Sequence, residues 1–212
     1  MMPVKRDQPR SKEQIEIKEH HKLIDMLKDQ KKQYSNQLES IQSALMEREL
    51  KRMILSLDKR IKKLESEVAK LIQSSPKLKA SFDLITSIPG IGACNASKLL
   101  GQIINIDDFK SAKQFAAFIG LTPMQRQSGQ FSGRTKRSKI GHVKLRNGLY
   151  MASLSARRYN PVLKKFADRL EASGKAPKAV LCAVMRKLAH IVFGVLKHKQ
   201  PFKADYVLLR SS

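Results

Sequence analysis

The segment from Ser11 to Ser75 contains neither glycine nor proline, and residues with high helix propensity dominate it. Such a composition predicts long helices. Apolar residues recur within it at steps of three and four, the spacing that forms the seam of a coiled coil. They are Tyr34, Leu38, Ile41 and Leu45, followed by Ile54, Leu57, Ile61, Leu64, Val68 and Leu71. We therefore predict a coiled-coil helical arm over residues 11–75, preceded by a disordered tail over residues 1–10.

The seam loses its register between Leu45 and Leu50, where the step is five residues. At this point the helix either absorbs a stutter or bends into a second segment. The arm could pack on its own chain or on a second copy. With more than 60 helical residues and little else for them to pack on, we favour a homo-oligomer formed through the coiled coil.

A second region, predicted over residues 76–206, begins with the sequence FDLITSIPGIGACNASKLLGQI over residues 82–103. Amphipathic helical segments flank Pro89, Gly90, Ile91 and Gly92, which is the pattern of a helix-hairpin-helix motif. Glycines allow a sharp turn and a close approach to phosphate, and a helix N-terminus attracts anions. We expect Gly90 and Gly92 to contact a phosphate backbone, although an ordinary helical turn would show the same residues.

The remaining helices are indicated by their end signals. Ser111 and Gly120 are a candidate N-cap and stop for a short helix whose apolar face holds Phe115, Phe118 and Ile119. Residues 142–199 then predict further helices, with Asn160-Pro161 and Pro177 at helix starts. Two apolar faces are expected there: Val143, Leu145, Leu149, Ala152 and Leu154, then Val180, Val184, Leu188, Ile191 and Val195. The predicted fold class is all-α.

The charge is strongly unbalanced, with 42 Lys and Arg against 18 Asp and Glu. The 59 residues between Asp108 and Asp168 contain 13 Lys or Arg and no acid. Solvated surfaces normally mix both signs, so this zone predicts contact with nucleic acid. Its centre is a basic loop over residues 122–141. The candidate phosphate contacts of the loop and the helix after it are Arg126, Gly129, Arg134, Lys136, Arg137, Lys139, Lys144 and Arg146.

The acid-free zone also limits the chemistry that this region can perform. Cleavage by two metal ions needs converging carboxylates, and the zone supplies none. A hydroxyl nucleophile supported by Arg and Lys remains possible. Ser128 precedes a glycine that would let a phosphate approach closely, but spacing alone hardly distinguishes Ser128 from Ser132 and Ser138. Each of the three also fits an ordinary polar turn.

Other classes of protein are disfavoured. Cys94 and Cys182 lie far apart, and the five histidines show no ligand spacing, so we expect no metal in this chain. The N-terminus lacks the apolar core of a signal peptide, and no run of about 18 uncharged apolar residues occurs. We therefore expect a cytoplasmic protein with no membrane association.

Three blocks occur in a fixed order: LITSIPGIGACNASKLLGQI, FKSAKQFAAFIGLTPMQRQSG and GRTKRSKIGHVKLRNGLYMAS. Together they resemble the C-terminal transposase domain of the insertion-sequence family numbered 110, also described by the numbers 116 and 902. Its members are RNA-guided recombinases related to the Piv and MooV invertases. The resemblance covers roughly residues 15–205.

The resemblance implies a catalytic role for Ser128. In the family the nucleophile belongs to a Ser-Gly pair after a Gly-Leu-x-Pro segment, which matches Ser128-Gly129 after Gly120-Leu-Thr-Pro123. It also implies a covalent link to DNA, a guide (bridge) RNA, an oligomer of two dimers, and a separate N-terminal RuvC-like domain with a DEDD acidic site. Mg²⁺ is expected only in that acidic domain.

This chain departs from the family pattern at its start, where the coiled coil should begin. Asp7, Glu13 and the acids of the arm do not map onto the four acidic positions, so we expect no DNA cleavage by the chain alone. The leading hypothesis is the DNA-binding C-terminal portion of a transposase. The alternatives are a non-catalytic, dimerising nucleic-acid-binding protein, such as a regulatory or remnant transposase, and an RNA-binding structural protein.

Overall fold

The protein is all-α, as the sequence predicts. A computed structural model describes residues 10–103, 105–124, 127–128, 131–132, 136–137 and 141–204, with only the backbone described in the strands between 123 and 137. Eight α-helices and four strands of two residues each make up the described regular structure, together with one short 3₁₀ helix. The chain divides into two compact units, Met1–Lys79 and Ala80–Ser212.

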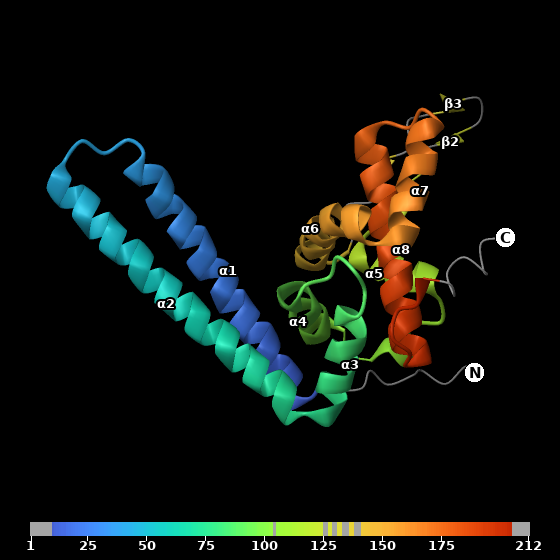
Figure 1. Ribbon diagram of the computed structural model, residues 1–212, viewed down its shortest axis with the longest axis horizontal. Helices are drawn as coiled ribbons and strands as arrows, with labels where there is room; N and C mark the ends of the chain where they lie inside the picture. Colours follow the sequence, from blue (N-terminus) through green and yellow to red (C-terminus); the bar gives the residue numbers. More distant parts are fainter. Residues whose placement is uncertain are drawn as a thin grey trace. The chain divides into compact units, whose positions relative to one another are not determined.

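The first unit is an antiparallel helical hairpin of α1 (Lys12–Leu38) and α2 (Ala44–Ser74), drawn in blue and teal in Figure 1. Ser11 begins α1 through a capping box with Gln14. The two helices bury one seam between them and are tied by ion pairs from Lys28 and Lys31 of α1 to α2. The buried residues of α2 are Leu50, Leu57, Ile61, Val68 and Ile72, which step by seven and four. This spacing is the heptad pattern of a helix pair.

The arm bends earlier than the change of register predicts. The helix ends at Leu38 and restarts at Ala44, so the predicted continuous run from Tyr34 to Leu45 is wrong. The break contains no glycine or proline; within it the hydroxyl of Ser40 donates to the Gln37 carbonyl, and Ser43 is the N-cap residue of α2 without a side-chain cap hydrogen bond. Serine hydroxyls compete with helical hydrogen bonds in this way.

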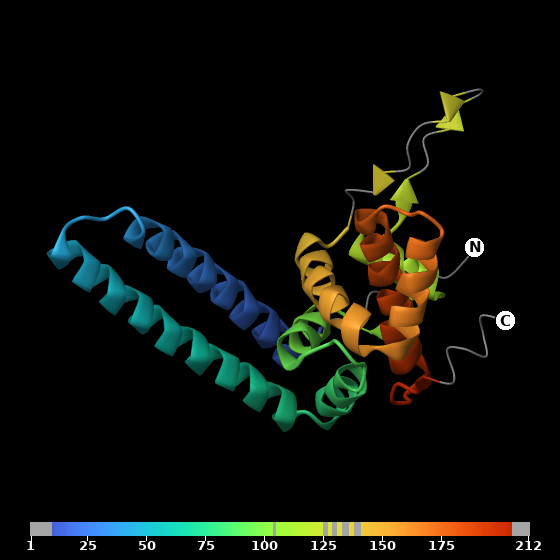
Figure 2. The same cartoon turned by 45° about the horizontal axis from the view of Figure 1, so that its top comes forward.

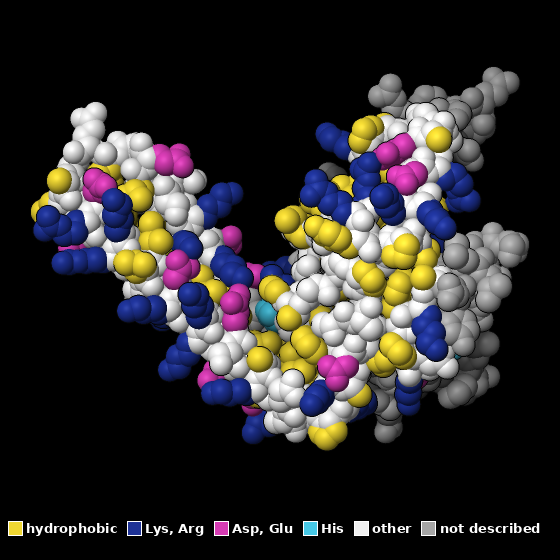
Figure 3. Space-filling view, viewed as in Figure 1, with side chains coloured by type: hydrophobic (Ala, Val, Ile, Leu, Met, Phe, Trp, Pro, Cys, Tyr) yellow, Lys and Arg dark blue, Asp and Glu magenta, His cyan; other side chains and the backbone are white. Residues whose placement is uncertain are grey.

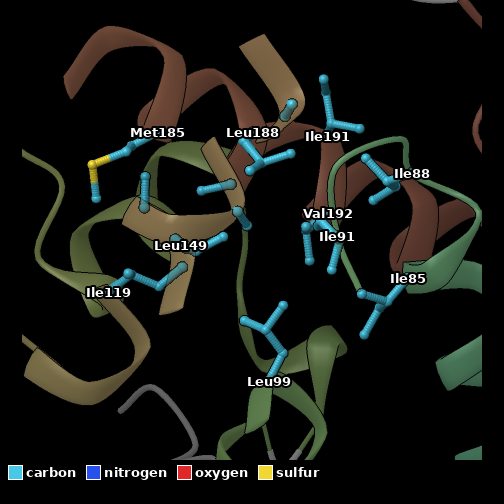
Figure 4. Close-up of a cluster of buried hydrophobic side chains, with 14 of the residues drawn as sticks. Ile85, Ile88, Ile91, Leu99, Ile119, Leu149, Met185, Leu188, Ile191 and Val192 are labelled. Atoms are coloured by element: carbon cyan, nitrogen blue, oxygen red, sulfur yellow. The ribbon is translucent and has the colours of Figure 1, made fainter. Parts of the chain in front are cut away.

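The second unit packs its helices around one hydrophobic core (Figure 4). Its elements are the C-terminal part of α3 (Pro76–Thr86), α4 (Ala93–Gln102), η1 (Ile106–Asp108), α5 (Ala112–Ile119), α6 (Val143–Tyr159), α7 (Pro161–Ala172) and α8 (Pro177–His198). α8 is the central helix, and the five apolar residues predicted for its face are all buried. Phe115 of α5 is fully buried and packs edge-on against Phe109 at 5.2 Å.

Local signals define the helix ends as expected. The Ser111 hydroxyl accepts from the backbone N–H of Gln114 at the start of α5, and Gly120 ends that helix with φ of 85°. The buried Asn160 side chain accepts from the N–H groups of Val162 and Leu163 at the start of α7. Each signal lies within three residues of the group that it bonds, which explains why it is readable from sequence.

The predicted apolar face of α6 is only partly correct. Leu145, Leu149 and Ala152 are buried in the core, whereas Val143 and Leu154 are exposed. Steps of four and three relate Leu145, Leu149 and Ala152, whereas Val143 and Leu154 lie about three turns apart on a different side of the helix. The helix therefore carries apolar side chains on two different faces, and the prediction merged them.

Candidate nucleic-acid interface

The loop over residues 122–141 is held closed at its base by two glycines. Gly120 and Gly141 both have positive φ, 85° and 120°. A Cβ on Gly141 would lie 2.5 Å from the backbone nitrogen of Gly120, so only glycine permits this approach. The N–H of His142 donates to the Phe118 carbonyl at 3.2 Å, and the two rings lie 4.8 Å apart. The C-terminal end of the loop is thereby fixed to the end of α5.

Two short antiparallel strand pairs extend from this base. β1 (Pro123–Met124) pairs with β4 (Lys136–Arg137), and β2 (Gln127–Ser128) pairs with β3 (Phe131–Ser132). Figure 2 shows β2 and β3 farther from the helices than β1 and β4. The described strand pairs of the loop therefore project from the helical unit as a narrow ribbon.

Ser128 lies in the outer pair, with Phe131 as its register partner. Ser132 is opposite Gln127, so the two serines occupy different register positions of the ribbon. Lys136 and Arg137 form β4 in the inner pair. The remaining predicted loop residues, which are Arg126, Gly129, Arg134, Lys139 and the third serine Ser138, lie outside the described residues.

The structure gives the two glycines of the predicted hairpin different surroundings. Gly90 has φ of 99°, and a Cβ there would lie 2.5 Å from the Ala156 Cβ of α6. Gly92 is exposed, has φ of −81° and would place a Cβ in open space as the N-cap of α4. Gly92 is therefore open to solvent at the first turn of α4, while the half-buried Gly90 packs closely against α6. Contact of either residue with DNA stays a prediction.

The two cations predicted on α6 also differ. Lys144 is exposed, whereas Arg146 is 8% exposed and belongs to the buried side of the helix. Helical spacing contained the signal that separates them, because residues two positions apart on a helix that turns by about 100° per residue lie about 200° apart, on opposite faces. A phosphate contact by Arg146 stays a prediction.

Further exposed cations lie on α7, in the connection after it and at the start of α8. They are Lys164, Lys165, Arg169, Lys175 and Lys178. The last three follow Asp168, and none of the five was among the predicted contacts. The side chains coloured for Lys and Arg in Figure 3 gather around this part of the second unit. The sequence signal that could have identified these five cations is that basic residues continue past Asp168, beyond the acid-free zone.

The positive field extends to α8. Burial lowers the pKa of His190. The positive charges of Arg186, Lys187 and Lys113 lower this pKa further, because they repel the charge that the imidazole ring would gain on protonation. Nearby, Lys197 is paired with Asp107 at 2.6 Å. Among the described residues, no three His, Cys, Asp or Glu side chains come together as a metal site. Among them α8 alone is long and apolar enough to span a membrane, but half of it is buried as a core helix.

Comparison with known proteins relates this part of the chain to a family of transposases. Residues 82–168, from the end of α3 through the loop to α7, match the model of the Transposase IS116/IS110/IS902 family. The chain is 37% identical over 147 residues to the pilin gene-inverting protein of Moraxella bovis, and equally to that of Moraxella lacunata, covering 67% of this chain and 45% of each relative. The 43.6 kDa protein of insertion element IS110 from Streptomyces coelicolor is 24% identical, over 63% of this chain and 32% of the relative.

These matches and the all-helical fold define a transposase- or recombinase-like protein. Through residues 82–168 the chain belongs to the IS116/IS110/IS902 transposase family, as its three ordered sequence blocks indicate. The matched segments span less than half the length of each of these relatives.

Proposed function

We propose that this chain is the DNA-binding C-terminal portion of an insertion-sequence transposase or recombinase that cuts and rejoins DNA through Ser128. The observation that carries the proposal is the family match over residues 82–168, which contains the basic loop and its Ser-Gly pair. The close contact of Gly120 and Gly141 at the base of the loop supports the proposal, because a nucleophile on a projecting loop must be held in position by the rigid part of the protein.

In the proposed reaction, the Ser128 hydroxyl oxygen forms a bond to a DNA phosphorus atom. The bond from phosphorus to a deoxyribose oxygen breaks, and that oxygen leaves with a proton as a free hydroxyl. The loop cations stabilise the charge on the phosphoryl oxygens. By resemblance, the site would be completed by acids of a RuvC-like domain, which would hold Mg²⁺, and by a guide RNA. Inversion of DNA, which the name of the Moraxella relatives indicates for those proteins, would use the same chemistry.

The DNA-binding part of the proposal predicts a specific salt dependence. Replacing Lys136 and Arg137 by alanine removes two charges from β4, so the slope of log K against log salt for duplex DNA should become less steep by about 1.8. Affinity should fall to a similar extent for unrelated sequences, because phosphate contacts carry no sequence information. Fluorescence anisotropy at several salt concentrations measures both.

The matched control removes the same charge from the arm, at the exposed Lys62 and Lys63 of α2. Those variants should retain the wild-type slope. Equal slopes for the loop and arm variants would show that the loop does not contact DNA phosphates. A wild-type affinity that does not change with salt would contradict DNA binding through phosphates altogether.

We further propose that the arm forms a homo-oligomer through its outer end. Leu45, Met46 and Met53 are exposed near the turn of the hairpin, where α1 has no buried residue after Leu27. Leu57, by contrast, is buried between α1 and α2, so its replacement would open the hairpin itself. A second copy packed on the outer end would cover the exposed side chains.

Replacing Leu45 and Met53 by serine should therefore lower the mass measured by sedimentation equilibrium while leaving helical content unchanged. Replacing the exposed Leu55, on another face of α2, provides the control and should leave the mass as it is. A wild-type monomer at micromolar concentration would contradict this role of the arm.

A further inference from the structure

The exposed face of α6 is unusually apolar for a helix whose opposite face already lies in the core. Val143, Tyr150, Met151 and Leu154 are 54%, 44%, 60% and 40% exposed. Val143, Tyr150 and Leu154 follow one another at steps of seven and four, and so form a single line along the helix, with Met151 beside it. The line is about 16 Å long at 1.5 Å per residue. A surface helix normally places polar residues on such a face.

The exposed polar neighbours of this apolar line on α6 are cationic or neutral, and the half-buried Arg157 beside it is paired with Glu171 of α7. Lys144, Asn147 and Arg158 occupy the exposed positions next to it, and α6 contains no acid. Figure 3 shows hydrophobic side chains gathered at the surface over α6, with Lys and Arg side chains nearby. The line begins two residues after Gly141, where the basic loop is fixed. It therefore extends the interface from the base of the loop along the helix.

Charge decides what could cover this face. A second copy of α6 would bring Lys144 and Arg158 against equal charges with no acid on the helix to offset them, which disfavours a symmetric contact. A polyanion with apolar faces fits both features. Unpaired nucleotides have this chemistry, because their bases stack on aromatic and apolar side chains while their phosphates meet Lys and Arg. A duplex covers its base faces and leaves such a line unused.

We propose that the exposed face of α6 is a stacking platform that holds an unpaired nucleic-acid strand beside the basic loop. Tyr150 takes the face of a base, Val143, Met151 and Leu154 extend the apolar contact, and Lys144 and Arg158 meet the phosphates. This rests on the proposed function in taking nucleic acid as the partner, and goes beyond it by assigning a site for unpaired rather than duplex strands. A DNA strand parted for cleavage at the adjacent loop has this chemistry and is the occupant that we propose; single-stranded RNA, which shares the chemistry, is an outcome of the test.

The test compares Tyr150→Ala with Tyr159→Ala in the full chain. Tyr159 is 70% exposed and lies about two and a half turns after Tyr150, on the opposite side of the same helix, so it is a chemically matched control. Tyr150→Ala should weaken binding of a single-stranded oligothymidylate roughly 5- to 150-fold, the value of one lost stacking contact. Its slope of log K against log salt should stay the same, because no charge is removed. Tyr159→Ala should bind as the wild type does.

A direct readout is available because the chain contains no tryptophan. In Tyr150→Trp the indole is the one such fluorophore, and stacking on an added oligothymidylate should quench it, whereas duplex DNA should quench it far less. Parallel titrations with oligouridylate separate RNA from DNA as the source of the strand.

The outcomes separate this inference from the proposed function. A wild-type chain that binds neither duplex nor single strands contradicts the proposed function itself. A chain that binds both, but loses no single-strand affinity in Tyr150→Ala, contradicts only the platform. An equal loss of affinity for duplex DNA in Tyr150→Ala would also contradict the platform. A lower sedimentation mass of Tyr150→Ala would place a second copy of the chain on α6 instead. Equal quenching of Tyr150→Trp by anionic lipid vesicles would place a membrane surface there.

Discussion

Ser128→Ala should abolish the covalent protein–DNA product while leaving DNA affinity within about twofold of the wild type. One neutral hydroxyl contributes little to the affinity of an interface made of many phosphate contacts. The proposed ester to DNA, however, is formed by the Ser128 hydroxyl oxygen itself. The reaction needs the acidic domain of a full-length relative, a guide RNA and magnesium. A denaturing gel with labelled DNA detects the product as a slowly migrating protein band.

Ser132→Ala and Ser138→Ala are the matched controls for this experiment. They remove the same group from the same loop, and Ser132 differs from Ser128 in its register position on the ribbon. Both variants should still form the adduct. An adduct that survives Ser128→Ala, or that disappears only in one of the control variants, would move the nucleophile to another serine. If no variant and no wild-type chain forms an adduct although all of them bind DNA, the non-catalytic binding protein becomes the better description.

The parts of the fold that were predictable from sequence depend on short-range signals. The cap of α5 at Ser111, the cap of α7 at Asn160 and the buried stripe of α8 each involve groups within one or two helical turns. Signals of this kind are contained in a few neighbouring residues, so they can be read without knowledge of the tertiary contacts. Helical class and the positions of these helices could therefore be predicted before any tertiary contact was known.

Features that depend on the packing of distant segments were not predictable. The turn after Leu38 depends on α1 and α2 pairing along a shared seam, and the apolar pattern alone continued through it. The same limit applies to α6, where periodicity could not show which apolar residues the core would bury. In the loop, physical reasoning left three serines equivalent, and only the order of the family blocks distinguished Ser128. Its assignment as nucleophile still awaits the adduct experiment.

Gly90→Ala should destabilise the second unit by about 2–5 kcal/mol, because the new Cβ meets the α6 backbone and the residue holds a left-handed conformation. For a chain of this size that loss should lower Tm by roughly 4–20 °C in a thermal melt followed by circular dichroism. Gly92→Ala should change the stability by less than about 1 kcal/mol, since its φ of −81° suits any residue and nothing lies near its Cβ position.

The two glycines were predicted to do the same thing, and this pair of variants separates packing from phosphate contact. Because Gly92 is exposed at the first turn of α4, a methyl group there would stand between the helix N-terminus and an approaching phosphate. Gly92→Ala should therefore weaken DNA binding without lowering Tm, whereas Gly90→Ala should lower Tm and affect binding only through the folded fraction. If both variants bind DNA as the wild type does after correction for folding, the turn before α4 is a structural connection and the loop alone contacts DNA. If Gly90→Ala melts at the wild-type temperature, the close contact between this turn and α6 is wrong.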